Sequence, residues 1–573
     1  MSARSLDARM VTALVQLRQS LVAAPLPFEL PETAALAADR ARMIDQLEDY
    51  LIPRMATLEA PLLVVVGGST GAGKSTLVNS LVGERVTVPG VLRPTTRSPV
   101  LVHHPEDAGW FGQDRLLPEL VRVDYTTDDP DRIQLVPSAA VPRGLAILDA
   151  PDVDSVEERN RLLATQLLAA ADLWLFVTSA ARYSDQVPWE HLRHAADRNA
   201  SVAIVLDRTA DDAVPVVRTH LARMLAARGL KDSPLFCVAD GQVDDDGLLP
   251  AGHVAEIRRW LESLAADADA RQAVVRQTLE GAVRLVTLSS YPIADAVASQ
   301  HEIAVRLHAD AVAAVEAAAA TLAAASADGT LLRGDLLARW REFLGGTDLL
   351  RPVEGRVGGL RERLVNTLKG KPQQAERVLA GLEASLVALV AEHAERVAGD
   401  VAAVWEADPA GAAALAADPD LRRASRDLPR RTERAVRAWQ EDLAALVRDE
   451  TATKRTSARF LALGVSGLSV VLAVLAVAGE PDAGAAEPTA AGRALLDSIV
   501  GASVSATLIE RARRSWEQRV TAVLHDESAR YLALVDGLVG EPQAAARLRE
   551  AARRVDDLRF EVSRGDAGSG ETA

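Results

Sequence analysis

The chain has 573 residues, of which 49% are hydrophobic but only 3% aromatic, and it carries a formal net charge of −16 at pH 7. This length corresponds to roughly three to four domains. The excess of acidic residues argues against non-specific nucleic-acid binding, which requires a basic surface. The single cysteine, Cys237, excludes an intrachain disulfide and a cysteine-based metal site and suits a reducing compartment.

The residues before position 60 predict helices. Amphipathic patterns over residues 5–24 and 32–57 are separated by a segment with two prolines, and the first 20 residues contain no apolar core of a signal peptide. We expect residues 1–59 to form helices that pack with a helical stalk later in the chain.

A strand, a glycine-rich turn and a helix follow one another from residue 62. An apolar run over residues 62–66 precedes the sequence Gly68-Ser69-Thr70-Gly71-Ala72-Gly73-Lys74-Ser75-Thr76. It matches the P-loop pattern G-x-x-x-x-G-K-[ST], in which backbone N–H groups and a helix N-terminus bind phosphate oxygens. We therefore expect residues 68–76 to hold a nucleotide. Lys74 should reach the β- and γ-phosphates, and Ser75 should bind Mg²⁺.

Residues 60–268 alternate between short apolar runs and helical patterns. This alternation predicts an α/β P-loop G domain, with a mostly parallel sheet covered by helices on both faces. The expected strands after the first are Val100–His103, 120–124, Leu145–Asp149, 173–178, 201–206 and Leu235–Ala239. The expected helices are 156–171, 187–198, 213–228 and 253–266.

Two further segments are candidates for the magnesium site. The loop over residues 91–99 lies after the first helix, where the first switch of a G protein lies, and Thr96 is our candidate Mg²⁺ ligand, with Thr95 as second choice. The expected strand Leu145–Asp149 is apolar and ends in a carboxylate, which is the Walker B arrangement. We expect Asp149 to hold Mg²⁺ directly or through water.

The residues after Asp149 depart from the G-protein pattern D-x-x-G, because Asp152 stands in the place of the glycine. A carboxylate facing a γ-phosphate would repel it. We therefore expect Asp152 to point away from the phosphate or to play another part. Binding of Mg²⁺ through water by Asp152 and Asp154 is the alternative.

The base-reading motif [NT]-K-x-D is also altered. Its place at the end of the expected strand 201–206 is taken by Asp207-Arg208-Thr209-Ala210-Asp211. We expect Arg208 to stack on the base and Asp207 to accept its N–H groups, while Asp211 comes one residue late. The motif therefore leaves the choice between GTP and ATP open.

Long helical patterns rich in alanine and arginine replace the strands after residue 268 and predict a bundle or stalk over 269–457. Residues 460–478 then carry no charge and would span about 28 Å as a helix, close to the hydrocarbon thickness of a bilayer. With basic residues on both outer flanks, residues 458–509 predict a membrane hairpin, although Asp497 interrupts its second limb. The alternative is a hairpin buried in the bundle. We expect a returning helix over 510–563 and a disordered tail over 564–573.

The segments 64–82, 92–100 and 148–155, together with the order of the parts, resemble the dynamin-like branch of the P-loop GTPases, including bacterial dynamin-like proteins and actinobacterial G-domain proteins. Gly68, Gly73, Lys74 and Ser75 match the P-loop of that family, Thr96 its switch threonine and Asp149 its Mg²⁺ aspartate. Lys74 and Thr96 are the residues to which the resemblance gives a catalytic role. Dynamins have a glutamine and a serine in the P-loop to orient water, where this chain has Thr70 and Gly71.

The resemblance implies a GTPase that binds GTP and Mg²⁺ and has a helical trunk with a membrane-binding tip. It further implies homo- or hetero-oligomers formed through the G domain, with lipid bound through 460–509. The G domain would face the cytoplasm at the cytoplasmic membrane. A nucleotide-binding scaffold with little hydrolysis, working in a heteromeric membrane complex, is the alternative. An ATP-driven transporter subunit is disfavoured because no L-S-G-G-Q-type signature is present.

Overall fold

The computed structural model describes residues 3–28, 30–88, 98–113, 115–155, 157–197, 199–210, 212–345, 371–451, 458–479, 483–538 and 541–569. The chain divides into two compact units. The first, which we call the sheet unit, comprises Met1–Leu26, Pro31–Ser299 and Gly540–Ala573. The second, the helical unit, comprises Pro27–Leu30 and Gln300–Val539. These two units group residues that contact one another in space, whereas the segments expected above follow the sequence. The boundaries of those segments therefore stay predictions.

An eight-stranded sheet forms the centre of the sheet unit, as far as the described residues extend, in the order β3-β4-β2-β5-β1-β6-β7-β8. All neighbouring strands are parallel except β2 and β5. The strands are β1 Leu62–Gly68, β2 Val100–His103, β3 Val121–Val123, β4 Arg132–Pro137, β5 Leu145–Asp149, β6 Leu173–Ser179, β7 Ser201–Thr209 and β8 Leu235–Ala239.

The mostly parallel α/β sheet predicted from the sequence is confirmed. Strands β1, β5 and β6 are buried along their whole length, which explains why their sequences are continuous apolar runs. Sequence reasoning missed β4, although Arg132-Ile133-Gln134-Leu135 alternates polar and apolar residues, because the run is short and only Ile133 is fully buried.

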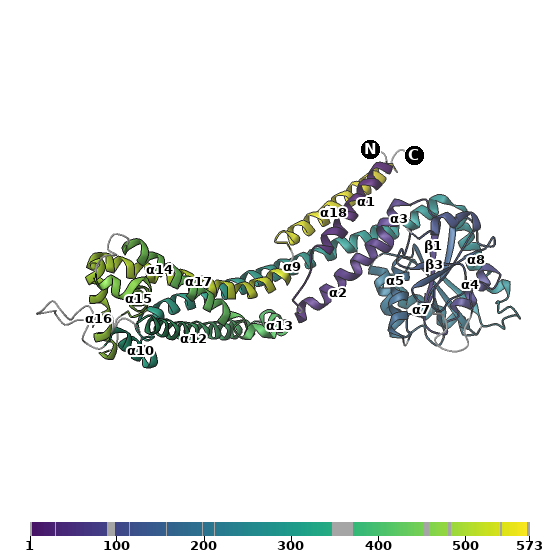
Figure 1. The fold of residues 1–573 in the computed structure, drawn as a ribbon. Coiled ribbons are helices and arrows are strands. Elements are labelled where there is room, and N and C mark those ends of the chain that lie inside the picture. Colours follow the sequence, from purple (N-terminus) through teal and green to yellow (C-terminus); the bar gives the residue numbers. More distant parts are fainter. Residues whose placement is uncertain are drawn as a thin grey trace, which may run out of the picture. The chain divides into compact units, whose positions relative to one another are not determined.

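Helices flank both faces of this sheet. They are α4 Lys74–Val82, α5 Glu158–Ala169, α6 Gln186–Asp197, α7 Val214–Ala226 and α8 Ala251–Ala266. Figure 1 shows α4 and α8 on one side of the strands and α5 and α7 on the other. The short 3₁₀ helix η2 Pro105–Phe111 follows β2.

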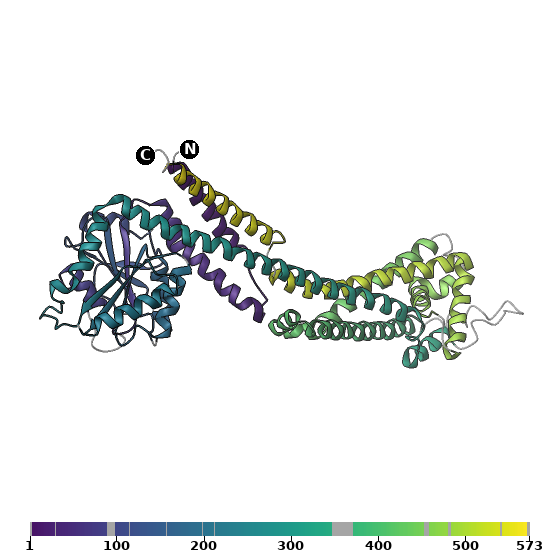
Figure 2. The same ribbon diagram turned by 180° about the vertical axis from the view of Figure 1, so that it is seen from behind.

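The N-terminal helices belong to the sheet unit. They are α1 Ala3–Val22, α2 Pro31–Gln46, the π-helical turn η1 Leu47–Leu51 and α3 Ile52–Ala56. Helix α1 lies side by side with α18 Ala544–Ser569 in both views (Figures 1 and 2), and the two pack on each other. Helix α18 continues to Ser569, beyond residue 564, where the sequence predicts that a disordered tail begins.

A buried carboxylate connects these helices to the sheet. Asp172, which precedes β6, accepts hydrogen bonds from Tyr50 Oη at 2.9 Å, Arg54 Nε at 2.8 Å and the Leu63 N–H at 2.8 Å. Its own carbonyl accepts from Thr278 Oγ1 of α9 at 3.0 Å. Asp172 and Arg54 are fully buried, so the pair is held in a low-dielectric environment in which each charge depends on the other.

The helical unit contains the remaining helices, and α9 Ala268–Ala327 contributes residues to both units. The others are α10 Gly334–Leu344, α12 Lys371–Glu406, α13 Pro409–Ala417, the short 3₁₀ helix η4 Pro419–Arg422, α14 Leu428–Thr451, α15 Ala458–Val477, α16 Ala483–Val500 and α17 Ala502–Leu538. Buried tryptophans anchor their core: Trp439 of α14 donates to the Ala512 carbonyl at 2.8 Å and packs on Trp516. The absence of strands predicted for this region is confirmed for the described residues.

The apolar segment near residue 470 lies inside this core. Every residue from Val470 to Val477 is at most 5% exposed, and Leu468 is fully buried. The first limb is therefore packed inside the helical unit in this structure, as in the alternative of a buried hairpin, while a membrane hairpin over 458–509 stays a prediction. Helix α15 is broken at Gly464, whose φ of 65° and ψ of −174° are not helical. In the second limb, Asp497 lies 4.0 Å from Arg493 of the same helix.

Among the described residues, one helix, Ala268–Ser326, is long and apolar enough to cross a membrane by length and composition. The bent pair Ala485–Val500 and Ala502–Gly537 would count as a second span, whereas Leu463–Val477 is apolar but shorter. Core helices of soluble proteins meet the same criterion, so this finding alone assigns no membrane segment.

The Asp172 cluster gives a prediction about stability. Asp172→Asn leaves the Arg54 guanidinium buried without a counter-charge, so we expect the free energy of unfolding to fall by about 3–5 kcal/mol. Urea unfolding followed by circular dichroism measures it. Asp131→Asn is the matched control, because its ion pair with Arg159 is about two-thirds exposed on both sides and should contribute at most about 1 kcal/mol. Equal losses in the two variants would contradict this account.

Candidate nucleotide site

The P-loop turn leaves the sheet at the carboxyl end of β1. A Cβ on Gly68 would lie 2.0 Å from the Val177 carbonyl oxygen of β6, so only glycine fits there. Gly71 and Gly73 have φ values of 75° and 93°, in the left-handed region that favours glycine. The turn ends at Lys74, where α4 begins, so the loop leads directly into a helix N-terminus, the end of a helix that favours anions.

Ser75 and Asp149 meet beside this turn, as the sequence predicted for a metal pair. The register of β1 on β5 aligns Val66 with Asp149, and Ser75 Oγ donates to Asp149 Oδ2 at 2.6 Å. Burial raises the pKa of Asp149 to about 6, against the opposing effects of the Ser75 hydroxyl and Lys74. Its other oxygen, Oδ1, is buried without a hydrogen-bond partner among the described residues.

Lys74 does not project freely into the loop. Its Nζ forms an ion pair with Asp152 and also donates to the Ser69 carbonyl at 3.2 Å. Both charged side chains are about 95% buried, at 5% and 6% exposure. Of the two expectations for Asp152, the structure agrees with another part, because its carboxylate neutralises the P-loop lysine.

A second carboxylate of the same segment is bonded to the P-loop. Asp154 Oδ1 accepts from the Thr70 N–H at 2.6 Å and from Thr70 Oγ1 at 2.8 Å, and Asp154 Oδ2 lies 3.0 Å from Arg182 Nη1. This contact was not predicted from the sequence. The sequence signal for the contact of Asp154 with Thr70 is the polar turn that directly follows the Walker B strand.

The expected base-reading residues lie at the end of β7. Asp207 is buried, its Oδ1 accepts the Arg208 N–H at 2.8 Å, and a Cβ on Gly73 would come within 2.2 Å of its Oδ2. Burial raises the pKa of Asp207 to about 6. The Asp207 carboxylate is thus packed on the P-loop, whereas the Arg208 side chain is exposed. Thr95, Thr96 and Asp211 lie outside the described residues.

These groups fit a magnesium nucleotide. Hydroxyl and carboxylate oxygens are the ligands that Mg²⁺ prefers, and the unpartnered Asp149 Oδ1 beside Ser75 offers one. The buried Ser69 Oγ of the glycine turn also has no partner among the described residues. A phosphate with its metal would satisfy these atoms and oppose the burial cost of the Asp149 charge.

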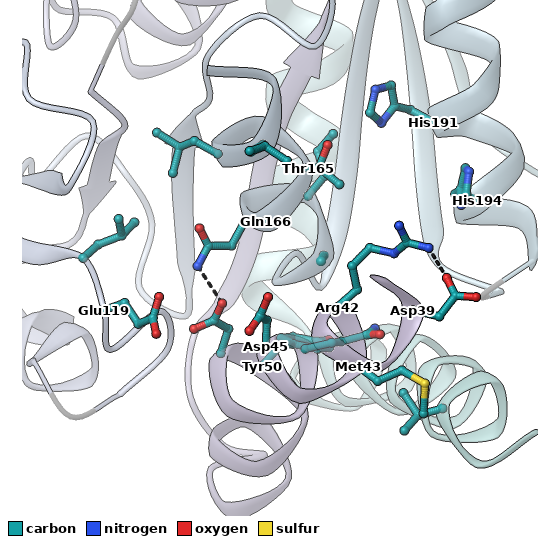
Figure 3. Close-up of a pocket in the computed structure, with 18 of the residues that line it drawn as sticks. Asp39, Arg42, Met43, Asp45, Tyr50, Glu119, Thr165, Gln166, His191 and His194 are labelled. Atoms are coloured by element: carbon teal, nitrogen blue, oxygen red, sulfur yellow. Dashed lines mark hydrogen bonds and ion pairs between the residues drawn. The ribbon is translucent and has the colours of Figure 1, made fainter. Parts of the chain in front are cut away.

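A separate cavity of about 810 Å³ lies in the sheet unit, lined by residues of α2, η1, α5, α6, α9 and the loops around β3. Figure 3 shows Asp45, Glu119 and Gln166 around it, and no P-loop residue lines it. Gln166 Nε2 donates to Asp49 at 2.7 Å. Burial raises the pKa of Asp49 to about 6, and the nearby carboxylates Glu119 and Asp45 add to the rise.

Comparison with known proteins bears on the nucleotide site. Residues 64–120 match the model of the dynamin family. A protein of Arabidopsis thaliana described as a probable transmembrane GTPase FZO-like, chloroplastic, is 24% identical over 216 residues. That match covers 36% of this chain and 22% of the relative, so the chain spans less than a quarter of the relative's length. These matches confirm the resemblance to dynamin-like GTPases that the motifs predicted.

Two chains of solved structures align over 96% of this chain and 95% and 94% of their own length. Both are described as an oligomerised bacterial dynamin pair that provides a mechanism for the long-range sensing and tethering of membranes. The sequence identities are 9% and 11%, and each TM-score is 0.36. A TM-score of this size does not establish a common fold.

The buried carboxylate of the cavity gives a prediction about pH. The pKa of Asp49 rises from 3.8 to about 6 on folding, so the folded state favours the protonated form, and stability is lost as pH rises from 4 through 6. Asp49→Asn removes this loss. We expect the variant to be about 1–3 kcal/mol more stable than the parent at pH 7 but equal to it near pH 4.

Urea unfolding of both proteins at pH 4 and pH 7 measures this difference. Asp39→Asn, which removes an exposed carboxylate at the same cavity, is the control and should show no such pH-dependent gain. A constant difference between Asp49→Asn and the parent at both pH values would refute burial of the Asp49 charge as the cause.

Proposed function

We propose that the protein is a dynamin-like GTPase that binds GTP with Mg²⁺, hydrolyses it slowly and couples nucleotide state to self-assembly on the cytoplasmic membrane and its remodelling. The observation that carries the proposal is the meeting of Ser75, the residue after the P-loop lysine Lys74, with Asp149 at the carboxyl ends of β1 and β5. In this proposal Mg²⁺ supplies charge neutralisation at the phosphates, which is what phosphoryl transfer chiefly requires.

Each residue of the site then has a defined task. The N–H groups of the P-loop turn bind phosphate oxygens, and Lys74 binds the β- and γ-phosphates after it parts from Asp152. Ser75, Asp149 and Thr96 hold the metal. Slow hydrolysis is supported by Thr70 and Gly71, which stand in the P-loop where dynamins have a glutamine and a serine to orient water.

Base recognition is proposed for Arg208 and Asp207. The exposed Arg208 side chain is available to stack on a base, because a guanidinium is planar. The Asp207 carboxylate is buried against Gly73. In this proposal it accepts the base N–H groups only with the part of its oxygens that faces away from Gly73. GTP as the preferred nucleotide rests on the dynamin-family match rather than on these two residues.

Membrane binding is proposed through residues 460–509. Since Val470 to Val477 are buried in the helical unit, lipid contact through this segment requires that α15 leaves its packing partners. Such a movement exchanges one apolar environment for another, so it costs little hydrophobic free energy. Assembly would proceed through the G domain, as a homo-oligomer or with a related chain, and the G domain would face the cytoplasm.

A nucleotide-binding scaffold with little hydrolysis is the second candidate. The specific observations in its favour are the ion pair of Lys74 with Asp152 and the engagement of Thr70 by Asp154. Both contacts occupy groups that phosphate binding and water positioning would use. Phosphate release separates the two candidates: lipid-stimulated turnover favours the GTPase, and tight binding without turnover under any condition favours the scaffold.

The nucleotide site is tested by Lys74→Ala. The variant loses the side-chain cation that this proposal places on the phosphates, so we expect binding of labelled GTP and GDP to weaken at least a hundredfold. Equilibrium binding of GTP, GDP, ATP and ADP with Mg²⁺ to both proteins measures this and the base preference. Lys231→Ala, an exposed lysine before β8, is the control. Unchanged affinity in Lys74→Ala would rule out the assigned site.

The membrane segment is tested by photo-crosslinking from vesicles of anionic phospholipid that contain a diazirine lipid. With a non-hydrolysable GTP analogue we expect labelled peptides within 460–509, because exposure of α15 depends on nucleotide in this proposal. With GDP the labelling should be several-fold lower. Labelling confined to Ala268–Ser326, the longest apolar helix, or no labelling at all, would contradict the assignment.

A further inference from the structure

Asp152 brings a negative charge to the place where a nucleotide would bring its phosphates. The carboxylate is 6% exposed and faces the Lys74 ammonium, which is 5% exposed. The D-x-x-G pattern has a glycine at this position and offers only an N–H group. This chain therefore neutralises its P-loop lysine internally, and any phosphate that needs the lysine has to compete with a buried carboxylate.

The backbone around Asp152 is fixed to the P-loop on both sides. The Ala150 N–H donates to the Val66 carbonyl at 3.2 Å, and the Val153 N–H donates to the Gly68 carbonyl at 3.3 Å. Asp154 binds both polar groups of Thr70. These contacts hold the Asp152 carboxylate beside Lys74, so a change of its side-chain rotamer alone does not remove its charge from the neighbourhood of the loop.

The negative charge of Asp152 affects binding of a nucleoside triphosphate and of a nucleoside diphosphate to different extents. A triphosphate carries one more phosphate than a diphosphate and places it at the group that the P-loop lysine reaches. Repulsion between like charges in a buried site is strong because screening is weak. The diphosphate presents less charge to Asp152 and competes less directly with it for Lys74.

We propose that Asp152 is a specificity-determining residue that weakens binding of the nucleoside triphosphate relative to the diphosphate, and that triphosphate binding displaces residues 152–154 from the P-loop. This inference rests on the proposed nucleotide-binding function. The nucleotide state is then sensed by repulsion. The third phosphate repels the Asp152 carboxylate, whereas in the D-x-x-G pattern it would attract the N–H group of the glycine. Expulsion also releases Thr70 from Asp154 and Asp154 from Arg182.

The test compares affinities for GDP and for a non-hydrolysable GTP analogue, both with Mg²⁺, in the full-length protein and three variants. Asp152→Asn keeps the shape without the charge, and Asp152→Gly restores the residue of the D-x-x-G pattern. Asp232→Asn is the matched control, because Asp232 is exposed and lies before the amino end of β8, away from the P-loop edge. Thermal unfolding checks that each variant is folded.

We expect the ratio of the GDP dissociation constant to that of the analogue to rise about tenfold in both Asp152 variants and to stay unchanged in Asp232→Asn. Hydrogen exchange gives a readout that does not depend on affinity. In the parent protein the analogue, but not GDP, should speed exchange over residues 152–155. An unchanged ratio, or equal changes for the two nucleotides, overturns the inference alone. Absence of binding to either nucleotide in all four proteins overturns the proposed function and the inference together.

Discussion

The position of the P-loop depends on one buried carboxylate at the opposite end of the sheet. Asp172 binds the Leu63 N–H at the start of β1 and, at the same time, Tyr50 and Arg54 of the N-terminal helices. Because β1 is buried along its length and paired on both sides, fixing its start also fixes where it ends, at Gly68. The helices before the sheet are thus part of the support of the glycine turn.

At the carboxyl edge, the end of β5 and the turn after it place three carboxylates against the P-loop and the start of α4. Asp149 binds Ser75, Asp152 binds Lys74 and Asp154 binds Thr70. Burial raises the pKa of Asp149, so its charge is disfavoured unless a cation is near. A divalent metal suits such a site because it adds the positive charge that one lysine does not supply.

The sequence allowed the sheet and the turn to be predicted because their residues have few structural alternatives. Buried parallel strands select unbroken apolar runs, and the left-handed turn at Gly73 selects glycine. The partners of Asp152 and Asp154 depend on how the chain turns after β5, and no local pattern encodes that. The burial of α15 was also beyond a sequence argument, because a protein core and a lipid core select the same side chains as those from Val470 to Val477.

The break at Gly464 determines how the apolar part of α15 can move. A residue with a φ of 65° interrupts the helix, and an added Cβ there would have nothing within 4 Å. Rotation about this one residue swings the rod that follows it while every intrahelical hydrogen bond beyond the break stays intact. Movement about Gly464 is resisted by side-chain packing and by the hydrogen bond that Arg513 Nε of α17 donates to the Ala476 carbonyl at 3.3 Å.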